Sequence, residues 1–493
     1  MRPRVAIIGA GMSGIAMAAK LLQAGVADVR IFEKAQDYGG TWRDNTYPGL
    51  ACDVPSPFYS YSFAPNPDWT HRFSAGPEIH RYLCDVAERH GLREHTVFGT
   101  EIARCDWDGA RWTMETTTGA THVADVVVAA TGVLHRPRLP ELPGLETFAG
   151  PAFHSARWDH DVPLEGARIG VLGTGSTGVQ IVTALGEAGH QVTQFQRTPQ
   201  WTLPMGNAEY SRSTQRALRQ WPQLSRLLYR YHQRMLESTF EGLIKPGVKR
   251  WVVQTACRLN LWRVRDPELR ARLTPKDEPM CRRLIMSAGY YKAVQLPNVE
   301  IVSGGIARVE PTGLVTEDGR LHEIDVLVMA TGFDAQSYLR PMAVTGEDGV
   351  TLDEVWRDGP RAHRTIGMPG FPNLFLLLGP NSPIGNTSLF PIAEAQVAFV
   401  LRLVRRIAAG EATAYAPTPE ASAKFTHDIR EAMPDTVWVT GCDSWYLAPD
   451  GTPTLWPFTP QAFYDMLAAG PGDDFASIPA PAADTAATQA SSL

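Results

Sequence analysis

Two short glycine motifs constrain the fold of this chain more than any other feature. Both have the pattern G-x-G-x-x-G, and their glycines are Gly9, Gly11, Gly14, Gly173, Gly175 and Gly178. Each motif follows an apolar run that predicts a buried strand and precedes a segment with helical spacing. Glycines at these positions permit a tight turn and a close approach of the backbone to a pyrophosphate at a helix N-terminus. The chain is therefore predicted to contain two Rossmann-type dinucleotide-binding units.

The predicted elements around the two motifs repeat in the same order. Strand, helix and strand are expected at 5–8, 12–23 and 29–33, and again at 168–172, 176–187 and 192–197. Two further strands, 125–130 and 325–330, both lead into Thr-Gly, at Thr131-Gly132 and at Thr331-Gly332. This spacing predicts that the second unit is inserted within the first, so that the chain leaves the first domain near Gly132 and returns near Gly332.

The second strands of the two units end in different residues. Glu33 lies 19 residues after Gly14, where a carboxylate can accept hydrogen bonds from ribose hydroxyls. The corresponding strand of the second unit ends in Arg197-Thr198, and a guanidinium there matches a 2'-phosphate. The usual pair of dinucleotides in one chain is a hydride donor and a flavin. We therefore predict FAD at the first site and NADPH at the second.

These assignments divide the chain into domains of an α/β fold. The FAD-binding domain is expected to be discontinuous, at 1–145 and 331–475, with the NADP-binding domain inserted at 146–330. A helical insertion is expected at about 204–280, and its many arginines are interpreted as a solvated helical face rather than a binding site. Residues from about Gly470 are poor in large apolar side chains, so 476–493 is predicted to be a disordered tail.

Cysteine content and charge exclude several functions. The six cysteines form no C-x-x-C pair and no Cys/His cluster at metal spacing, so we expect free thiols, no metal and no dithiol electron acceptor. The net charge of -6 offers no basic face for nucleic acid and little attraction to anionic membranes, which leaves small molecules as partners. No apolar run is long enough to span a membrane, and the N-terminus lacks a secretory signal, so a cytoplasmic protein is expected.

A further motif links the chain to a known family. The segment F-x-G-x-x-x-H-x-x-x-W-D, with Phe148, Gly150, His154, Trp158 and Asp159, resembles the fingerprint of type I Baeyer–Villiger monooxygenases. The resemblance extends from Gly9 to about Phe475. Two of its motifs resemble the segment that lines the flavin in the family: Gly40-Thr41-Trp42 and Cys52-Asp53. The others are Arg197-Thr198 at the end of the NADPH strand, Arg282-Arg283 in the arginine segment, Thr331-Gly332 and Ser444-Trp445-Tyr446.

The resemblance implies a reaction and roles for individual residues. NADPH would reduce FAD, O2 would form a C4a-peroxyflavin, and this would insert one oxygen atom into a ketone to give an ester or lactone. Arg283 would be the catalytic cation that stabilises the anionic flavin, the peroxide and the charge on the substrate carbonyl, and Asp53 would orient it. Arg282 stands where many members have lysine and keeps a cation for the 2'-phosphate.

Several alternatives stay open from the sequence. A flavin-containing monooxygenase that oxygenates nitrogen or sulfur through a C4a-hydroperoxyflavin shares the same machinery, and a noncatalytic flavin protein would share the fold. His154 and Trp158 would either couple cofactor binding to domain rotation or only build a linker. Trp438, Trp445 and Trp456 would either cover the substrate pocket or pack in a core. The segment 43–46 differs from the aromatic-rich stretch of cyclohexanone-type members, so a small cyclic ketone is not assumed as the substrate. The sequence does not define the oligomeric state.

Overall fold

Two five-stranded parallel sheets form the framework of the molecule. The computed structural model describes residues 2–383, 385, 387–442, 444–448 and 451–478. The first sheet has the order β19-β7-β1-β2-β3 and the second has the order β8-β17-β9-β10-β13, and every pairing in both is parallel. The strands of the first sheet are β1 (Arg4–Ile8), β2 (Asp28–Phe32), β3 (Thr96–Val97), β7 (Val126–Ala129) and β19 (Leu374–Leu376). Those of the second are β8 (Ala152–His154), β9 (Arg168–Leu172), β10 (Gln191–Gln196), β13 (Val299–Ser303) and β17 (Val326–Met329).

The central strands are buried because helices and loops cover both faces of each sheet. All four residues of β7 and of β17 are buried, as expected for near-continuous apolar runs in parallel sheets. The predicted strand 168–172 and helix 176–187 are observed at those bounds, and the other predicted elements of the two units agree within two residues. The α/β fold class and the repeated Rossmann order are therefore confirmed.

Each parallel sheet carries an antiparallel sheet at the same point of its sequence, and the sequence analysis missed both. Between β3 and β7 lie β4 (Ile102–Trp107), β5 (Trp112–Thr116) and β6 (Thr121–Ala124), which pair antiparallel, and β18 (Ala343–Thr345) adds to β4 as a parallel edge strand. Between β13 and β17 lie β14 (Ile306–Glu310), β15 (Gly313–Thr316) and β16 (Leu321–Glu323). The paired two-residue strands β11 (Thr202–Leu203) and β12 (Ile285–Met286) lie beside the insertion.

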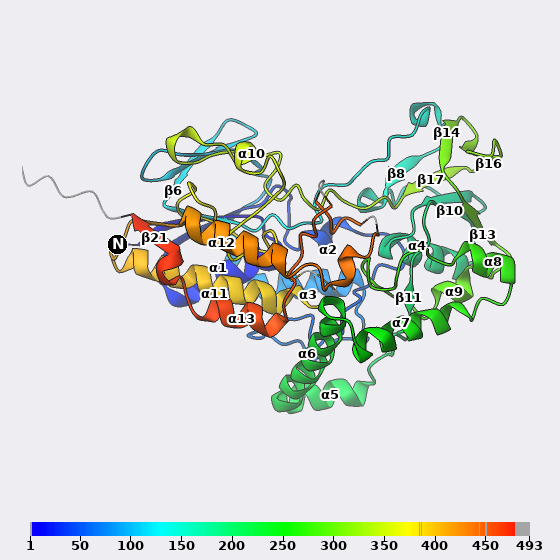
Figure 1. Ribbon diagram of the computed structural model, residues 1–493, viewed down its shortest axis with the longest axis horizontal. Helices are drawn as coiled ribbons and strands as arrows, with labels where there is room; N and C mark the ends of the chain where they lie inside the picture. Colours follow the sequence, from blue (N-terminus) through cyan, green and yellow to red (C-terminus); the bar gives the residue numbers. More distant parts are fainter. Residues whose placement is uncertain (1, 384, 386, 443, 449–450, 479–493) are drawn as a thin grey trace, which may run out of the picture.

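Helices surround the sheets in two groups (Figure 1). In Figure 1, α1, α11, α12 and α13 lie in one lobe, α4, α8 and α9 lie in the other, and α5 and α6 project from the lower side. The helices are α1 (Met12–Ala24), α2 (Thr41–Asp44), α3 (Gly76–Arg89), α4 (Ser176–Glu187), α5 (Arg212–Gln220), α6 (Pro222–Ile244), α7 (Val248–Leu261), α8 (Pro267–Arg272), α9 (Tyr290–Ala293), α10 (Leu352–Val355), α11 (Leu389–Ala408), α12 (Pro419–Glu431) and α13 (Pro460–Ala468). Helices α5 to α8 occupy the predicted insertion. No helix among the described residues is long and apolar enough to cross a membrane.

Two chain crossings between the lobes bind one another. The Thr131 hydroxyl donates to the carbonyl oxygen of Tyr338 at 3.1 Å, and the Thr331 hydroxyl donates to that of Arg138 at 2.6 Å. The backbone N–H of Asp334 also donates to the carbonyl oxygen of Arg136. These reciprocal bonds support the predicted insertion of one unit within the other, whose boundaries stay a prediction.

The prediction of a disordered tail at 476–493 is wrong for residues 476–478, which the structure describes as part of a strand. Phe475–Ile478 forms β21, which pairs antiparallel with β20 (Ala414–Pro417). Phe475 is buried, and its ring lies 5.2 Å from that of Phe399 and 5.5 Å from that of His363. One aromatic anchor and a strand partner thus order a segment that composition alone made polar. Residues 479–493 of the predicted tail lie outside the described residues.

Candidate active site

The first glycine motif forms a close turn between β1 and α1. Gly9 has φ +104°, and a Cβ there would lie 2.6 Å from the carbonyl oxygen of Ala130, while a Cβ on Gly14 would collide with the carbonyl oxygen of Gly9. Helix α1 starts after Gly11 without a side-chain cap in the described structure. Its first N–H groups are therefore left for an anion such as a pyrophosphate.

Glu33 is placed against this turn. Its two carboxylate oxygens accept hydrogen bonds from the N–H groups of Ala10 (2.7 Å) and Ala35 (2.9 Å). Arg43 forms an ion pair with it at 3.1 Å, although the sequence analysis gave Arg43 no role. Glu33 is 4% exposed, so its charge is neutralised and fixed inside the protein. An anionic carboxylate accepts about four hydrogen bonds in total, which leaves capacity for a ribose hydroxyl.

Gly40, Thr41 and Trp42 close the same cradle. Gly40 has φ +51°, and a Cβ there would lie 3.2 Å from the Cα of Gly11, so a side chain would crowd the glycine turn. The Thr41 hydroxyl donates to the carbonyl oxygen of Leu134 at 3.4 Å, and the Trp42 indole donates to the hydroxyl of Tyr59 at 3.1 Å. These contacts hold helix α2 beside the first glycine motif.

The second glycine motif repeats the geometry of the first. Gly173 has φ +127°, and a Cβ there would collide with the carbonyl oxygen of Ala330, while a Cβ on Gly178 would collide with that of Gly173. Helix α4 starts after Gly175, again without a side-chain cap in the part of the chain that is described. Nothing lies within 4 Å of a Cβ built on Gly175, so this face of the turn is open. The residues present at both turns fit a dinucleotide pyrophosphate.

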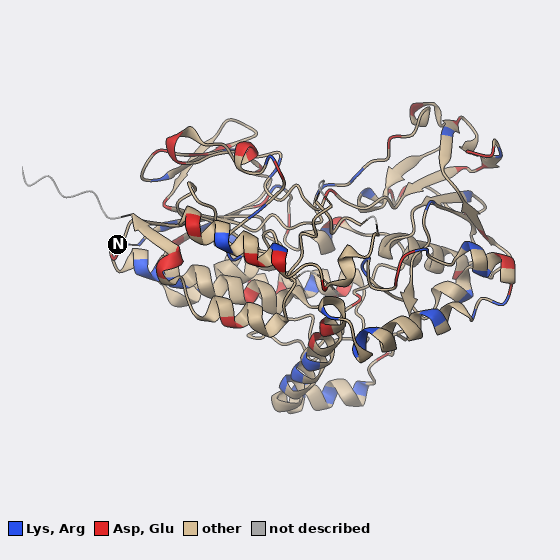
Figure 2. Ribbon diagram, in the orientation of Figure 1, with Lys and Arg blue, Asp and Glu red and all other residues tan. Residues whose placement is uncertain are grey.

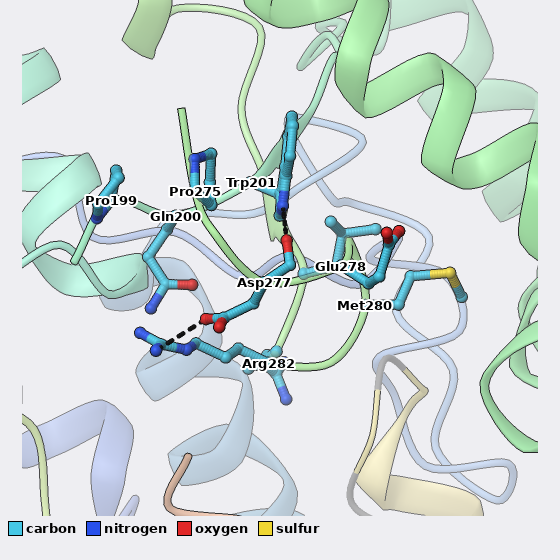
Figure 3. A pocket seen from close by; sticks show the side chains of 10 residues that line it. Pro199, Gln200, Trp201, Pro275, Asp277, Glu278, Met280 and Arg282 are labelled. Carbon is cyan, nitrogen blue, oxygen red and sulfur yellow. Dashed lines mark hydrogen bonds and ion pairs between the residues drawn. The ribbon is translucent and has the colours of Figure 1, made fainter. Parts of the chain in front are cut away.

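The predicted cations of the second site lie in two places. Arg197 is exposed just beyond β10, next to Thr198, whose carbonyl oxygen accepts from the Thr174 hydroxyl at 2.7 Å. Arg282 forms an ion pair with Asp277 at 2.8 Å. It lines a small surface pocket, which Figure 3 shows with the Arg282–Asp277 pair and the bond from the Trp201 indole to the Asp277 carbonyl oxygen.

Arg283 and Asp53 are 230 residues apart in sequence and form a bidentate ion pair. The guanidinium Nη2 lies 2.7 Å from Oδ1 and 2.8 Å from Oδ2 of Asp53, and Nε donates to Oδ2 at 3.1 Å. Their side chains are 27% and 15% exposed. Burial alone would lower the pKa of Arg283, but the charge of Asp53, its hydrogen bonds to the guanidinium and the nearby Tyr446 together outweigh burial and raise that pKa above its ordinary value. The pair therefore holds a permanent, oriented cation beside the segment that is predicted to line the flavin.

Tyr446 is a residue of this site to which the sequence analysis gave no role, although it quoted Ser444-Trp445-Tyr446 as a family motif. Burial raises the pKa of Tyr446 to about 12, and the nearby charge of Arg283 acts in the opposite direction. The ring of Trp445 lies 4.4 Å from that of Tyr446 and is partly exposed. Trp438 and Trp456 are buried, so of the three C-terminal tryptophans only Trp445 lies at the surface near the site.

The prediction that all cysteines are free thiols is wrong. Cys281 and Cys442 form a disulfide with a Cα–Cα distance of 6.1 Å. Sequence spacing could not reveal this pair because its members are 161 residues apart and meet only in the folded chain. The bond joins the segment that carries Arg283 to the segment that carries Tyr446. Disulfides are uncommon in reducing compartments, so this bond is not what the predicted cytoplasmic location would lead us to expect.

The fingerprint residues lie around the junction of the lobes rather than at Arg283. The His154 ring donates from Nε2 to the carbonyl oxygen of Gly332 at 2.9 Å and accepts at Nδ1 from the N–H of Ala156 at 3.1 Å. Burial lowers its pKa, which fits this neutral tautomer. A Cβ on Gly150 would collide with the carbonyl oxygen of Asp325, so a larger residue does not fit there.

The remaining fingerprint residues have structural contacts. Phe148 packs on the small core beneath the second sheet, and the Trp158 ring lies edge-on to Phe153 at 5.2 Å. Asp159 is exposed and accepts from the N–H of Asp161. The structure therefore brings His154 to the returning chain at Gly332 and leaves Phe148 and Asp159 apart from the ion pair.

One group of residues could offer ligands to a metal, although none was expected. Ligand atoms of Asp37, His80 and Cys84 lie within 4.8 Å of one another among the described residues. They already contact one another, since the Cys84 thiol lies 3.8 Å from a carboxylate oxygen of Asp37 and His80 Nε2 lies 3.6 Å from it. His80 also donates to the carbonyl oxygen of Tyr38 at 3.0 Å. These contacts explain why the three side chains lie together without a metal. The absence of a metal stays a prediction.

Comparisons with known proteins agree with this site. The family model described as "Flavin-binding monooxygenase-like" matches residues 2–342. A monooxygenase of Mycobacterium tuberculosis is 52% identical over 466 residues, which are 94% of each chain. A Baeyer–Villiger monooxygenase of Streptomyces coelicolor is 41% identical, with 93% of this chain and 90% of that protein covered. A closed crystal structure of cyclohexanone monooxygenase superposes with a TM-score of 0.87 and 31% identity, covering 97% of this chain and all of the other.

A relative with a different reaction also matches. A phenazine N-monooxygenase of Lysobacter antibioticus is 33% identical over 478 residues and covers 88% of each chain. Both reaction types therefore occur among proteins similar to this one.

The chain belongs to the family of flavin-binding monooxygenases. Its relatives and structural neighbours place it, within that family, among the Baeyer–Villiger monooxygenases. It is an FAD-dependent enzyme that takes its electrons from NADPH, and its two glycine cradles fit these two dinucleotides.

Proposed function

We propose that the enzyme converts a ketone into an ester or lactone with Arg283 as the catalytic cation. The bidentate pair of Arg283 with Asp53 carries this proposal. When bound, FAD supplies the electrons and activates the oxygen atom that is transferred. The protein must then stabilise negative charge at the reacting oxygen atoms, and a fixed guanidinium in a partly buried site does this without reorganisation.

Asp53 determines how the guanidinium can act. Since Nε and Nη2 of Arg283 are directed at Asp53, the Nη1 group faces the other way, where it lies 3.4 Å from the carbonyl oxygen of Gly385. A bond from Nη1 to a charged acceptor would be shorter and stronger than this one. We propose that Nη1 donates to the substrate carbonyl oxygen, while Asp53 keeps the arginine in place.

Replacement of Arg283 tests this role directly. We expect Arg283→Ala to lower ester formation by roughly 10²–10³-fold or more, the loss found for removal of one transition-state donor. NADPH should still bleach the flavin under anaerobic conditions, because other residues than Arg283 are proposed to bind NADPH. Arg111→Ala, at an exposed arginine far from the pair in sequence, is the matched control and should keep full activity. A normal ester yield from Arg283→Ala would overturn the proposal.

Oxygenation of nitrogen or sulfur is the second candidate, and the similarity to a phenazine N-monooxygenase favours keeping it. This reaction transfers oxygen to an electron-rich atom and needs no cation at a carbonyl oxygen. Paired ketone and sulfide substrates separate the two. If Arg283→Ala loses ester formation but keeps sulfoxide formation, Arg283 acts in the ketone reaction. If the variant keeps both activities, Arg283 has no catalytic role in either reaction.

We also infer that Arg197 and Arg282 select NADPH over NADH and that Glu33 binds the ribose of FAD. The exposed guanidinium beyond β10 and the one that lines the small surface pocket support the first assignment. The fixed carboxylate beside the first cradle supports the second. The cytoplasmic location stays a prediction.

A further inference from the structure

Exposed apolar side chains gather on one part of the surface. Fifteen large hydrophobic residues are exposed among the described residues, and nine of them belong to the segment 221–262 of the helical insertion. They include Trp251 (62% exposed), Trp262 (66%) and Tyr231 (61%). Monomeric proteins scatter such residues singly, and a contiguous set marks a surface that meets something else.

The apolar residues of α7 form one stripe. Val248, Trp251, Val252, Leu259 and Trp262 follow one another at helical spacing, so they lie on a single side of α7 and its end. On α6, Leu224, Leu227 and Tyr231 form a second stripe at i, i+3 and i+7. Both helices therefore turn a row of apolar side chains to solvent.

A row of arginines accompanies the stripe on α6. Arg226, Arg230 and Arg234 are spaced four residues apart and lie next to Leu227 and Tyr231 around the helix. All three are exposed, and no carboxylate pairs with them among the described residues. Figure 2 shows this concentration of blue on α6 and α7, at the lower side of the molecule.

The charge of the insertion is opposite to that of the rest of the chain. Residues 212–262 contain ten Lys or Arg and two Asp or Glu, which gives a net charge of +8. Because the whole chain has a net charge of -6, the remainder carries -14. The overall charge, from which the sequence analysis expected little attraction to anionic membranes, conceals this separation. Such a charge distribution orients the molecule, with α5 to α7 toward an anionic surface.

We propose that the helical insertion binds the surface of an anionic lipid bilayer through α6 and α7. Apolar stripes containing tryptophan, flanked by cations, are the pattern of helices that lie in the interface of a bilayer. The helices of the described chain do not span it. A second copy of the chain is a poorer fit, because two faces of charge +8 would repel one another in a symmetric dimer. A nucleic acid would use the cations but leave the aliphatic residues of the α7 stripe without apolar partners.

Co-sedimentation of the holoenzyme with vesicles tests the proposal. The probes are vesicles of phosphatidylcholine alone and of phosphatidylcholine with phosphatidylglycerol at a ratio of seven to three, each at low and high salt. We expect binding to the anionic vesicles, at least tenfold weaker binding to the neutral ones, and release at high salt. No binding to anionic vesicles at low salt would overturn the proposal.

Two sets of variants locate the contact. Replacing Arg226, Arg230 and Arg234 by Gln should weaken partitioning roughly a hundredfold, since each cation near an anionic surface contributes about fivefold. Trp251→Ser with Trp262→Ser should weaken binding to both vesicle types. The matched control replaces Arg320, Arg405 and Lys424 by Gln, at cations outside the insertion, and should bind as the wild type does. Equal losses in the control would contradict a role of α6.

Folding and other partners are controlled by three readouts. Flavin absorbance and turnover should be unchanged in every variant, which excludes misfolding as the cause of a loss. Light scattering compares the wild type with the tryptophan variant. A wild type that is dimeric and does not bind vesicles, together with a monomeric tryptophan variant, would overturn the proposal. Binding to a duplex oligonucleotide that is tighter than binding to the anionic vesicles would assign the face to nucleic acid instead.

Discussion

The two nucleotide-binding domains share one scaffold and carry opposite charges at the end of the second strand. Four of the five strands follow the same order in the two parallel sheets, and both glycine turns exclude a Cβ through the carbonyl oxygen of the alanine before a Thr-Gly pair, Ala130 or Ala330. At the end of the second strand, Glu33 is buried and fixed by two N–H groups and Arg43, while Arg197 is exposed. The scaffold therefore supplies a phosphate cradle, and we propose that the charge at this position selects the dinucleotide.

The domains also differ in how the chain completes them. The edge strand β8 of the second sheet precedes its glycine motif closely, whereas β19 of the first sheet arrives more than 240 residues after β7. The first domain is therefore finished only after the second has been made. As a result, the proposed active site lies where Asp53, from the first part of the chain, forms an ion pair with Arg283, from the inserted region.

The largest expected effect comes from adding one methyl group to each cradle. In both Gly14→Ala and Gly178→Ala the new Cβ meets a backbone oxygen that cannot move aside. We expect Gly14→Ala to be purified without FAD, and Gly178→Ala to keep FAD while its KM for NADPH rises at least about a hundredfold. Flavin absorbance and steady-state kinetics measure the two results. The comparison would fail if both variants lost the same cofactor.

Breaking the disulfide between Cys281 and Cys442 should have the next largest effect. It closes a loop of 161 residues and ties the inserted region to the C-terminal segment, so its loss is expected to cost about 3–5 kcal/mol of unfolding free energy. Denaturant unfolding of Cys281→Ser with Cys442→Ser measures this. Ester formation should fall more than NADPH binding, because Arg283 and Tyr446 flank the bond. An oxidised wild type no more stable than the double variant would show that the bond contributes nothing.

Removing the charge at each of the two strand ends should have a moderate effect, on NADPH in one case and on FAD in the other. Arg197→Ala should raise the KM for NADPH by roughly 10- to 100-fold and leave that for NADH unchanged, because one charge-assisted contact to the 2'-phosphate is lost. Glu33→Gln should weaken FAD binding by a similar factor without affecting NADPH. Flavin dissociation and kinetics with both nicotinamides test the pair. Equal loss with NADPH and NADH in Arg197→Ala would remove the basis for the assignment.

The smallest effect concerns pH at the junction of the lobes. Burial lowers the pKa of His135 to about 4 and lowers that of His154 as well. Because the folded state prefers both rings neutral, their contribution to stability is complete above about pH 6.5 and is lost as the pH falls toward 4. His135 should account for the larger part of this loss of stability, because its pKa lies well below the ordinary value for histidine. His154→Gln should flatten this part of the Tm profile, and an unchanged slope would exclude His154 as its source.

The sequence predicted the parts of the molecule that depend on local pattern. The glycine turns, the strands and helices beside them and the Thr-Gly crossings require particular residues at fixed spacing, so they could be recognised before the fold was known. The pair of Arg283 with Asp53 was predicted only from the family resemblance, because nothing in the spacing of two residues 230 apart indicates a contact.

The features that were missed depend on contacts distant in the sequence. The Cys281–Cys442 bond, the pairing of β21 with β20 and the ion pair of Arg43 with Glu33 are formed only when the chain is folded. The charge of the insertion was present in the sequence, but the net charge of the whole chain averaged it away. Local composition is therefore informative only after the elements have been placed.

The measurement that tests the account most directly is the fate of labelled oxygen in wild type and Arg283→Ala. With NADPH, 18O2 and a panel of aryl, linear and polycyclic ketones, mass spectrometry should find one 18O atom in an ester or lactone from the wild type. It should find almost none from Arg283→Ala, although the flavin is still reduced. Labelled ester in equal amount from both proteins, or labelled sulfoxide and N-oxide but no ester from the wild type, would contradict the account.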